Sequence, residues 1–213
     1  MNKSRLEAFS DGVFAIVITL LVLDIRIPKV DYDHLPDALI ALLPKILSYV
    51  YSFIIIGVYW ISHHNITRLV NKIDSVVLWG NILFLLSVCF IPFPTSLMGD
   101  YPFKLIPVLL YGSSLLVSNM LGFLIWAYVS YCHRLIDPET PKEQIGEINK
   151  SFLYINAFYV VAMGLMFWNV YASYTIFFSV LIYIVLFRNR VVITKTANES
   201  EKAHTPELNE YPL

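Results

Sequence analysis

Six apolar stretches, separated by polar or proline-containing breaks, dominate this sequence. They cover about residues 6–26, 38–62, 76–98, 105–131, 151–168 and 170–188. A helix that crosses a hydrocarbon core about 30 Å thick needs about 20 residues, so the pattern predicts an all-α membrane protein with six transmembrane helices. No charge separates the last two stretches, and one helix over both would run roughly 54 Å. A hairpin near Asn169 is therefore predicted.

Composition supports a membrane protein. Of the 213 residues, 57% are hydrophobic and 15% are charged, whereas a soluble domain carries about 25% charged residues. The surplus apolar surface predicts the lipid bilayer as a partner. The net charge of −1 offers no basic field for nucleic acid, so no nucleic-acid partner is expected.

The basic residues fall mainly on one side of the predicted spans. That side holds eleven, against three on the other, with Lys45 inside the second span. The eleven are Lys3, Arg5, Arg68, Lys72, Arg134, Lys142, Lys150, Arg188, Arg190, Lys195 and Lys202. The positive-inside rule then places both termini in the cytoplasm of a cell whose plasma membrane holds the protein.

The opposite side is acidic. It carries five carboxylates and three basic residues. The carboxylates either concentrate cations at the mouth of a conduction path or are ordinary solvated loop groups. They are Asp24, Asp31, Asp33, Asp37 and Asp100.

Domain organisation follows from the same pattern. Residues 1–190 are predicted to form one six-helix transmembrane domain. Residues 191–213 are polar and lack periodicity, which predicts a disordered cytoplasmic tail.

The first predicted helix is unusual because its uninterrupted apolar run covers only Val13–Leu23. Ser10 and Asp11 precede that run, and an ionisable group within a span normally faces a bundle interior or a water-filled path. This helix is therefore expected inside the protein, with no broad face toward lipid.

Placing the residues at 100° steps puts an apolar stripe on one side of this helix, with Ser10 and Asp11 projecting away from it. The stripe consists of Phe9, Gly12, Ile16, Thr19, Leu20 and Leu23. Periodicity leaves two interpretations open: a core helix whose Asp11 is satisfied by neighbours, or a pore helix whose stripe lines a conduction path.

Two motifs carry a family resemblance. The run Arg5-x-x-x-Phe9-Ser10-Asp11-Gly12, followed by Ala15-Ile16 and Thr19-Leu20-Leu21, resembles the R-x-x-x-F-S-D signature of the endosomal/lysosomal potassium channel family, the transmembrane protein 175 family. The run Tyr59-Trp60-Ile61-Ser62-His63-His64 is similar to the W-x-x-H-H of its prokaryotic members. The sequence has no T-V-G-Y-G filter and no arginine ladder.

The resemblance implies a homotetramer in which the first helix of each subunit lines a central pore. Rings of aliphatic side chains would gate and filter potassium, the innermost at Ile16 and further rings at Thr19 or Leu20 and at Leu23. Such a ring resists conduction by dewetting. Potassium is then the permeant ion, in transit near Thr19, with no fixed metal site and no cofactor.

The chemistry of the polar residues leaves alternatives open. The Thr19 hydroxyl either contacts the ion or bonds the carbonyl of Ala15. Asp11 is expected to meet a donor from His63 or His64, which is either a structural bond or a source of pH sensitivity. Arg5 is too far along the helix to pair closely with Asp11.

Other functions fit less well. A secondary transporter of a small cation or polar solute is the alternative, but it favours related repeats and broken helices at mid-membrane. Neither feature is visible. No nucleophile motif such as G-x-S-x-G supports an enzyme.

Overall fold

The structure, a computed structural model, describes residues 2–26, 28–131, 135–138 and 140–184. Within these ranges the regular elements are helices, apart from one isolated antiparallel bridge between Val70 and Ile136. They are α1 (Lys3–Leu20), η1 (Leu21–Asp24), η2 (Tyr32–His34), α2 (Leu35–Ala41), α3 (Leu43–Leu69), α4 (Ser75–Phe90), α5 (Pro92–Asp100), α6 (Leu105–Tyr131), α7 (Lys142–Leu165) and α8 (Val170–Tyr183).

Four helical segments are long and apolar enough to cross a membrane. They are Lys3–Asp24, Leu43–Leu69, Ser75–Asp100 and Leu105–Tyr131. α7 and α8 lie where the fifth and sixth spans are predicted, and α8 is a shorter apolar helix. The all-α fold is thus confirmed.

The predicted second span, 38–62, has the wrong bounds. Residues before Leu42 form the separate helix α2, and α3 then continues to Leu69. Pro44 accounts for the break, because proline fits the first turn of a helix but not its interior. The polar end of α3, with His63, His64 and Arg68, is helical because it packs against neighbours that sequence hydropathy does not register.

Prolines and an asparagine set two other boundaries. α4 ends at Phe90 and α5 begins at Pro92, as expected for a residue without a backbone N–H. The predicted hairpin near Asn169 is present: the Asn169 side chain accepts a 2.9 Å hydrogen bond from the Tyr171 backbone and caps α8.

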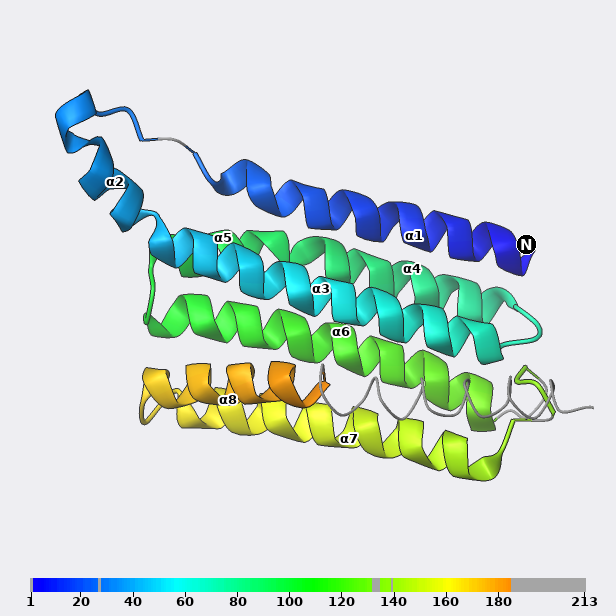
Figure 1. Cartoon of the computed structure of the whole chain (residues 1–213). Helices are drawn as coiled ribbons and strands as arrows, with labels where there is room; N and C mark the ends of the chain where they lie inside the picture. The colour runs from blue at the N-terminus through cyan, green and yellow to red at the C-terminus, as the bar shows by residue number, and fades with distance from the viewer. Residues whose placement is uncertain (1, 27, 132–134, 139, 185–213) are drawn as a thin grey trace, which may run out of the picture.

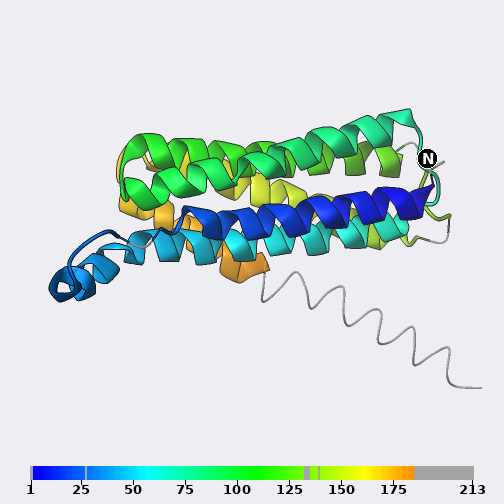
Figure 2. The ribbon, with the colours of Figure 1, turned by 90° about the horizontal axis from the view of Figure 1, so that it is seen from above.

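The long helices run antiparallel to their chain neighbours in one elongated bundle (Figure 1). α1 lies along one edge beside α3 and α4, and α7 with α8 forms the opposite edge. η2 and α2 project beyond the bundle at the end where α1 finishes (Figures 1 and 2). Within a single chain α1 is therefore peripheral, so it would lie inside the protein only if further copies cover it.

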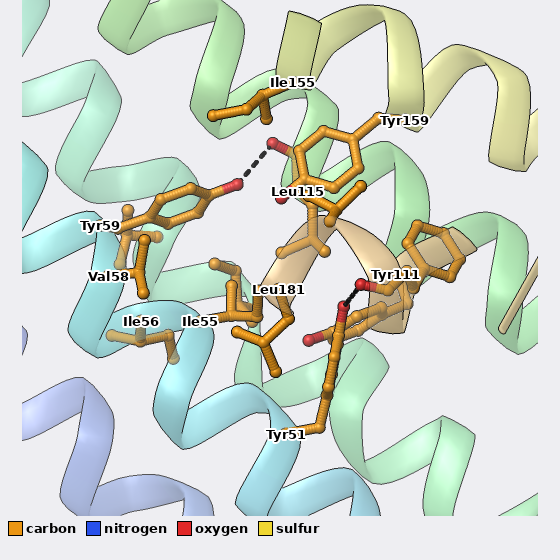
Figure 3. Packing of buried hydrophobic residues seen from close by; sticks show 14 of the residues in the cluster. Tyr51, Ile55, Ile56, Val58, Tyr59, Tyr111, Leu115, Ile155, Tyr159 and Leu181 are labelled. Carbon is orange, nitrogen blue, oxygen red and sulfur yellow. Dashed lines mark hydrogen bonds between the residues drawn. The ribbon is translucent and has the colours of Figure 1, made fainter. Parts of the chain in front are cut away.

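The core between α3, α6, α7 and α8 is built around tyrosines whose rings point inward (Figure 3). The Tyr51 hydroxyl donates to the Phe177 carbonyl at 2.8 Å, and the Tyr59 hydroxyl donates to the Leu115 carbonyl at 2.9 Å. A buried hydroxyl that finds a partner lets a large ring fill the core without a desolvation penalty. These bonds join α3 to α6 and α8 and make a fixed support for α1.

Some predictions fall outside the described residues. These are the placement of Arg134, the end of the last predicted span and the tail over 191–213.

Candidate functional site: the exposed face of the first helix

The predicted stripe of α1 and η1 is exposed along its whole length. Phe9, Gly12, Ile16, Thr19, Leu20 and Leu23 are all open in the single chain, with Ile16 60% and Leu23 67% exposed. The opposite face, which includes Leu6, Ser10, Phe14, Val17 and Leu21, is buried against the bundle. The helix is thus anchored by one side and presents an apolar stripe on the other.

Leu23, the last residue of the stripe, lies in a 3₁₀ helix and not in the α-helix α1. After Leu20 the chain tightens into the 3₁₀ helix η1, over Leu21–Asp24. The 100° construction assumes 3.6 residues per turn, whereas a 3₁₀ helix has 3.0. Ile16, Thr19 and Leu20 therefore share one regular face, and Leu23 is placed by the tighter winding.

The Thr19 hydroxyl makes a local bond, but not the expected one. It donates to the carbonyl of Ile16 at 2.8 Å, and not to that of Ala15. Donation uses the hydroxyl hydrogen and leaves the oxygen lone pairs open. A cation binds those lone pairs, so back-bonding and ion contact are compatible at this exposed residue.

Asp11 bonds a tryptophan, so the expectation of a histidine donor is wrong. Its Oδ1 accepts a 2.8 Å hydrogen bond from Nε1 of Trp60. Trp60 lies one turn before His63 and His64 on α3, and α1 crosses α3 at that level. The signal was in the W-x-x-H-H run, because an indole N–H is a donor only and suits a carboxylate.

His63 belongs to a separate, directional chain of hydrogen bonds across three helices. Its Nε2 lies 2.7 Å from Oδ1 of Asn81 on α4, and this amide oxygen can only accept. Nδ2 of Asn81 donates to the Ser10 hydroxyl at 3.1 Å, and Ser10 donates to the Leu6 carbonyl at 2.9 Å. Ser10 thus serves packing and not the exposed stripe.

Aromatic rings enclose the His63 imidazole. Phe84 stacks on it at 5.5 Å between ring centroids, and Phe14 of α1 lies at 5.8 Å. His64 points elsewhere, with its ring 6.3 Å from that of Trp60, and Arg5 is exposed. Across the described ranges no three His, Cys, Asp or Glu side chains gather into a metal-binding group.

Comparison with known proteins identifies the family. The profile described as "Endosomal/lysosomal potassium channel TMEM175" matches residues 5–92. A potassium channel of Chamaesiphon minutus is 35% identical over 194 residues, which is 88% of this chain and 96% of that protein. The chain belongs to the TMEM175 family.

Other TMEM175-family proteins agree over most of their length. A potassium channel of a Chryseobacterium species is 33% identical over 84% of this chain and 91% of its own. The crystal structure of the lysosomal potassium-selective channel TMEM175 homolog from Chamaesiphon minutus matches with a TM-score of 0.77 at 34% identity. That match covers 86% of this chain and 96% of that one. These relatives are ion channels and not enzymes.

In this TMEM175-family chain a small cavity lies behind α1, on the side away from the exposed stripe. It has a volume of about 50 Å³ and is bordered by Leu6 of α1, His63, Asn81 and Asn119. Nδ2 of Asn119 is buried and makes no hydrogen bond to the described residues. Since one water needs about 15 Å³, the cavity has room for water that would satisfy this amide.

The opposite end of the bundle holds an ion pair that the sequence left undecided. Nζ of Lys45 lies 2.7 Å from Oδ1 of Asp100, which ties α3 to α5. Gly99 permits this approach, because a Cβ there would lie 2.8 Å from Cγ of Lys45. A recess of about 270 Å³ joins this pair to the end of the stripe at Leu20 and Leu23.

Charged side chains lie at both ends of this TMEM175-family chain. Lys3, at the start of α1, donates to the carbonyl of Arg68 at the end of α3, so these two basic residues share one end. Asp24 and Asp100 lie at the other end, around the recess.

Proposed function

We propose that this protein is the subunit of a homotetrameric potassium-selective channel, with six transmembrane helices and both termini in the cytoplasm of a cell that carries it in the plasma membrane. The observation that supports this proposal best is the exposed stripe of α1. One subunit places the only polar group of the stripe, the Thr19 hydroxyl, in the open. In a tetramer with α1 around the central axis, the four Thr19 hydroxyls would form a ring.

The geometry of such an assembly gives stacked rings. Ile16 and Leu20 are four residues apart, so their rings would be separated by about 6 Å along the axis. Gly12 adds no side chain on the cytoplasmic side of Ile16. The space around it is open, since a Cβ built on Gly12 would have no other atom within 4 Å. The narrowest point would therefore form at Ile16.

Such a pore is gated by the loss and return of water at its apolar constriction. An apolar ring narrower than a hydrated ion excludes water and stays closed until it widens. Potassium loses its hydration shell at lower cost than the smaller sodium ion, which favours it at an aliphatic constriction. The Thr19 oxygens, one turn away, would replace part of that shell.

Charge supports the direction of the pore. The end with Lys3 and Arg68 would face the cytoplasm by the positive-inside rule. The other end would then form the outer mouth. Apart from the Lys45–Asp100 pair, its carboxylates Asp24, Asp31, Asp33 and Asp37 outnumber the basic residues Arg26, Lys29 and Lys104, and this surplus of negative charge would raise the local concentration of cations.

Two measurements test the proposal together. Native mass spectrometry of the detergent-solubilised protein should give four subunits, and purified protein in planar bilayers should give discrete single-channel currents with a potassium-selective reversal potential. Slow, saturable flux without current steps would instead favour a secondary transporter. A monomer that conducts would contradict the α1-lined pore.

A further inference from the structure

A third hollow lies away from α1, between α3, the loop after α5, α6 and α8. It has a volume of about 300 Å³, within the range of ligand pockets. Its walls are almost wholly apolar and include Leu47, Tyr51, Phe103, Tyr111, Phe177 and Phe178. We call this hollow the aromatic groove.

The tyrosine hydroxyls at the floor of the aromatic groove already have hydrogen-bond partners. The Tyr51 hydroxyl is already donated to the Phe177 carbonyl, and the Tyr111 hydroxyl lies 2.9 Å from that of Ser52. Apart from the Ser48 hydroxyl on α3, ring faces and aliphatic groups are left to contact an occupant. A ligand without hydrogen-bonding groups fits this surface better than a polar solute.

The position of the groove matches one leaflet of a bilayer. Its α3 wall runs from Leu43 to Tyr51, which is about 12 Å of helix, and half of a hydrocarbon core is about 15 Å. Exposed aromatic residues lie in and beside the α5–α6 and α7–α8 loops at the same end of the bundle (Figure 1), as they do at membrane interfaces. They include Tyr101, Phe167, Trp168 and Tyr171, with Trp168 93% exposed.

Phe103 shapes the mouth at an energetic cost. Its φ of 59° is in the left-handed region, which is unfavourable for a bulky residue. The ring lies 4.9 Å from that of Tyr171 and 5.1 Å from that of Tyr174, so the strained loop is held against α8. A backbone held this way at the rim of a hollow indicates a constraint on its shape.

The charge at the mouth is positive. Lys104 follows Phe103, is exposed, and makes no ion pair with any residue that the structure describes. The nearby Asp100 is neutralised by Lys45. A phosphate at headgroup level would therefore meet an unpaired ammonium group.

We propose that the aromatic groove binds an acyl chain of an anionic phospholipid, with the headgroup phosphate at Lys104. α8 lies at the opposite edge of the bundle from α1 (Figure 1), so the groove is open to lipid when α1 faces a pore. The bound lipid would tie the α5–α6 loop to α3 and α8. This site is separate from the conduction path.

The test uses the full chain in nanodiscs that contain phosphatidylglycerol with a diazirine on its acyl chain. After photolysis, peptide mass spectrometry should find adducts concentrated on the groove-lining segments of α3, α6 and α8. Ser48→Phe, which fills the groove, should reduce those adducts about tenfold. The matched control Val117→Phe, on the exposed face of α6, should leave them unchanged.

Lys104→Gln tests the headgroup without touching the core. It should lower the preference for phosphatidylglycerol over phosphatidylcholine about fivefold, the value of one basic residue near an anionic surface. Adducts spread evenly over all exposed apolar residues would overturn the proposal. So would Ser48→Phe adducts at the wild-type level, or cross-links from the groove to a second subunit, because another copy would then occupy it.

Discussion

At the residue scale, Thr19 stands out because its single hydroxyl could serve two purposes at once in the proposed channel. The hydrogen is committed to the Ile16 carbonyl at 2.8 Å, which fixes the direction of the oxygen. The lone pairs are left on the exposed side of α1. A local bond of this kind pre-orients an oxygen for a cation and does not compete with it.

Thr19→Val should weaken selectivity, because it keeps the side-chain shape and removes four oxygens from the ring. At a net of roughly 0.5–1.5 kcal/mol per hydroxyl, the usual value of a hydrogen bond, four hydroxyls give at least about 2 kcal/mol, and the preference for potassium over sodium should fall about 30-fold or more. The measurement is the reversal potential in mixed potassium and sodium. Thr19→Ser, which retains the oxygen, is the control and should resemble wild type. An unchanged reversal potential in Thr19→Val would leave discrimination to the aliphatic rings.

Ile16→Asn should give a leaky, less selective pore, because a carboxamide hydrates the constriction that an aliphatic ring keeps dry. Open probability should rise, and the sodium current should rise relative to potassium, in planar-bilayer recordings. Val22→Asn places the same amide on an exposed residue off the stripe and should conduct normally. Wild-type conduction in Ile16→Asn would show that the gate lies elsewhere.

At the scale of helices, two sets of polar contacts fasten α1 to the bundle. Asp11 is bonded to Trp60 of α3 at the rim of the contact, and Ser10 is bonded to Asn81 of α4 inside it. Ser10 and Asp11, the two polar residues of the F-S-D run, therefore hold α1 to different neighbours. Together they fix its rotation, and hence the direction of the stripe.

The Asp11–Trp60 bond should be worth about 1.5–3 kcal/mol, as for a hydrogen bond to a charged group. A double-mutant cycle of Asp11→Ala and Trp60→Phe, measured as loss of tetramer on heating, should give a coupling of that size. Strictly additive effects would show that the two side chains act independently.

Asn81→Leu should destabilise the fold by about 2–3 kcal/mol, because it leaves the His63 ring N–H and the Ser10 oxygen without partners in a buried site. Ser87→Ala on the same helix is the control, since its hydroxyl bonds only the local Phe84 carbonyl. Thermal unfolding of the two variants should differ clearly. If Asn81→Leu were as stable as wild type, the chain of hydrogen bonds would carry no stability.

The sequence predicted the α1 stripe because a helix repeats every 3.6 residues and its apolar positions follow that period. It could not predict Trp60 as the partner of Asp11, since the relative level of two packed helices depends on side-chain shapes along both. The end of α3 was missed for a related reason. His63 and Arg68 lower the hydropathy there, but His63 is packed between Phe14 and Phe84.

At the scale of the whole molecule, the turn before α4 fastens α4 to α6 at the end of the bundle where α3 finishes. Asp74 caps α4 by accepting from the Val77 backbone at 2.9 Å, and it also accepts from the Tyr128 hydroxyl of α6 at 2.7 Å. The bond from Tyr128, together with that from Val77, lowers the pKa of Asp74. The carboxylate form is therefore favoured in the folded protein.

Because the folded pKa of Asp74 is depressed, its contribution to stability is present above the ordinary value of about 4 and is lost as the pH falls through the folded value. Asp74→Asn should be less stable than wild type at neutral pH, and the difference should vanish in acid. Thermal unfolding between pH 7 and 3 measures this. Asp33→Asn, in the projecting segment near α2, should leave the profile unchanged. A constant difference between Asp74→Asn and wild type at all pH values would assign the effect to shape alone.

In the proposed channel, the short 3₁₀ turn at the end of α1 would give the outermost ring, at Leu23, a freedom of rotation that the ring at Ile16 lacks. Each residue turns 120° in a 3₁₀ helix and 100° in an α-helix. Rewinding Leu21–Leu23 to α geometry would swing Leu23 by about 60° about the helix axis. The backbone below Leu20 would stay where Asp11 and Ser10 hold it. In the proposed channel, rotation of Leu23 would change the width of the outer ring while the inner ring at Ile16 stays fixed. Contacts of Asp24 and Arg26 in the recess would then control the outer ring.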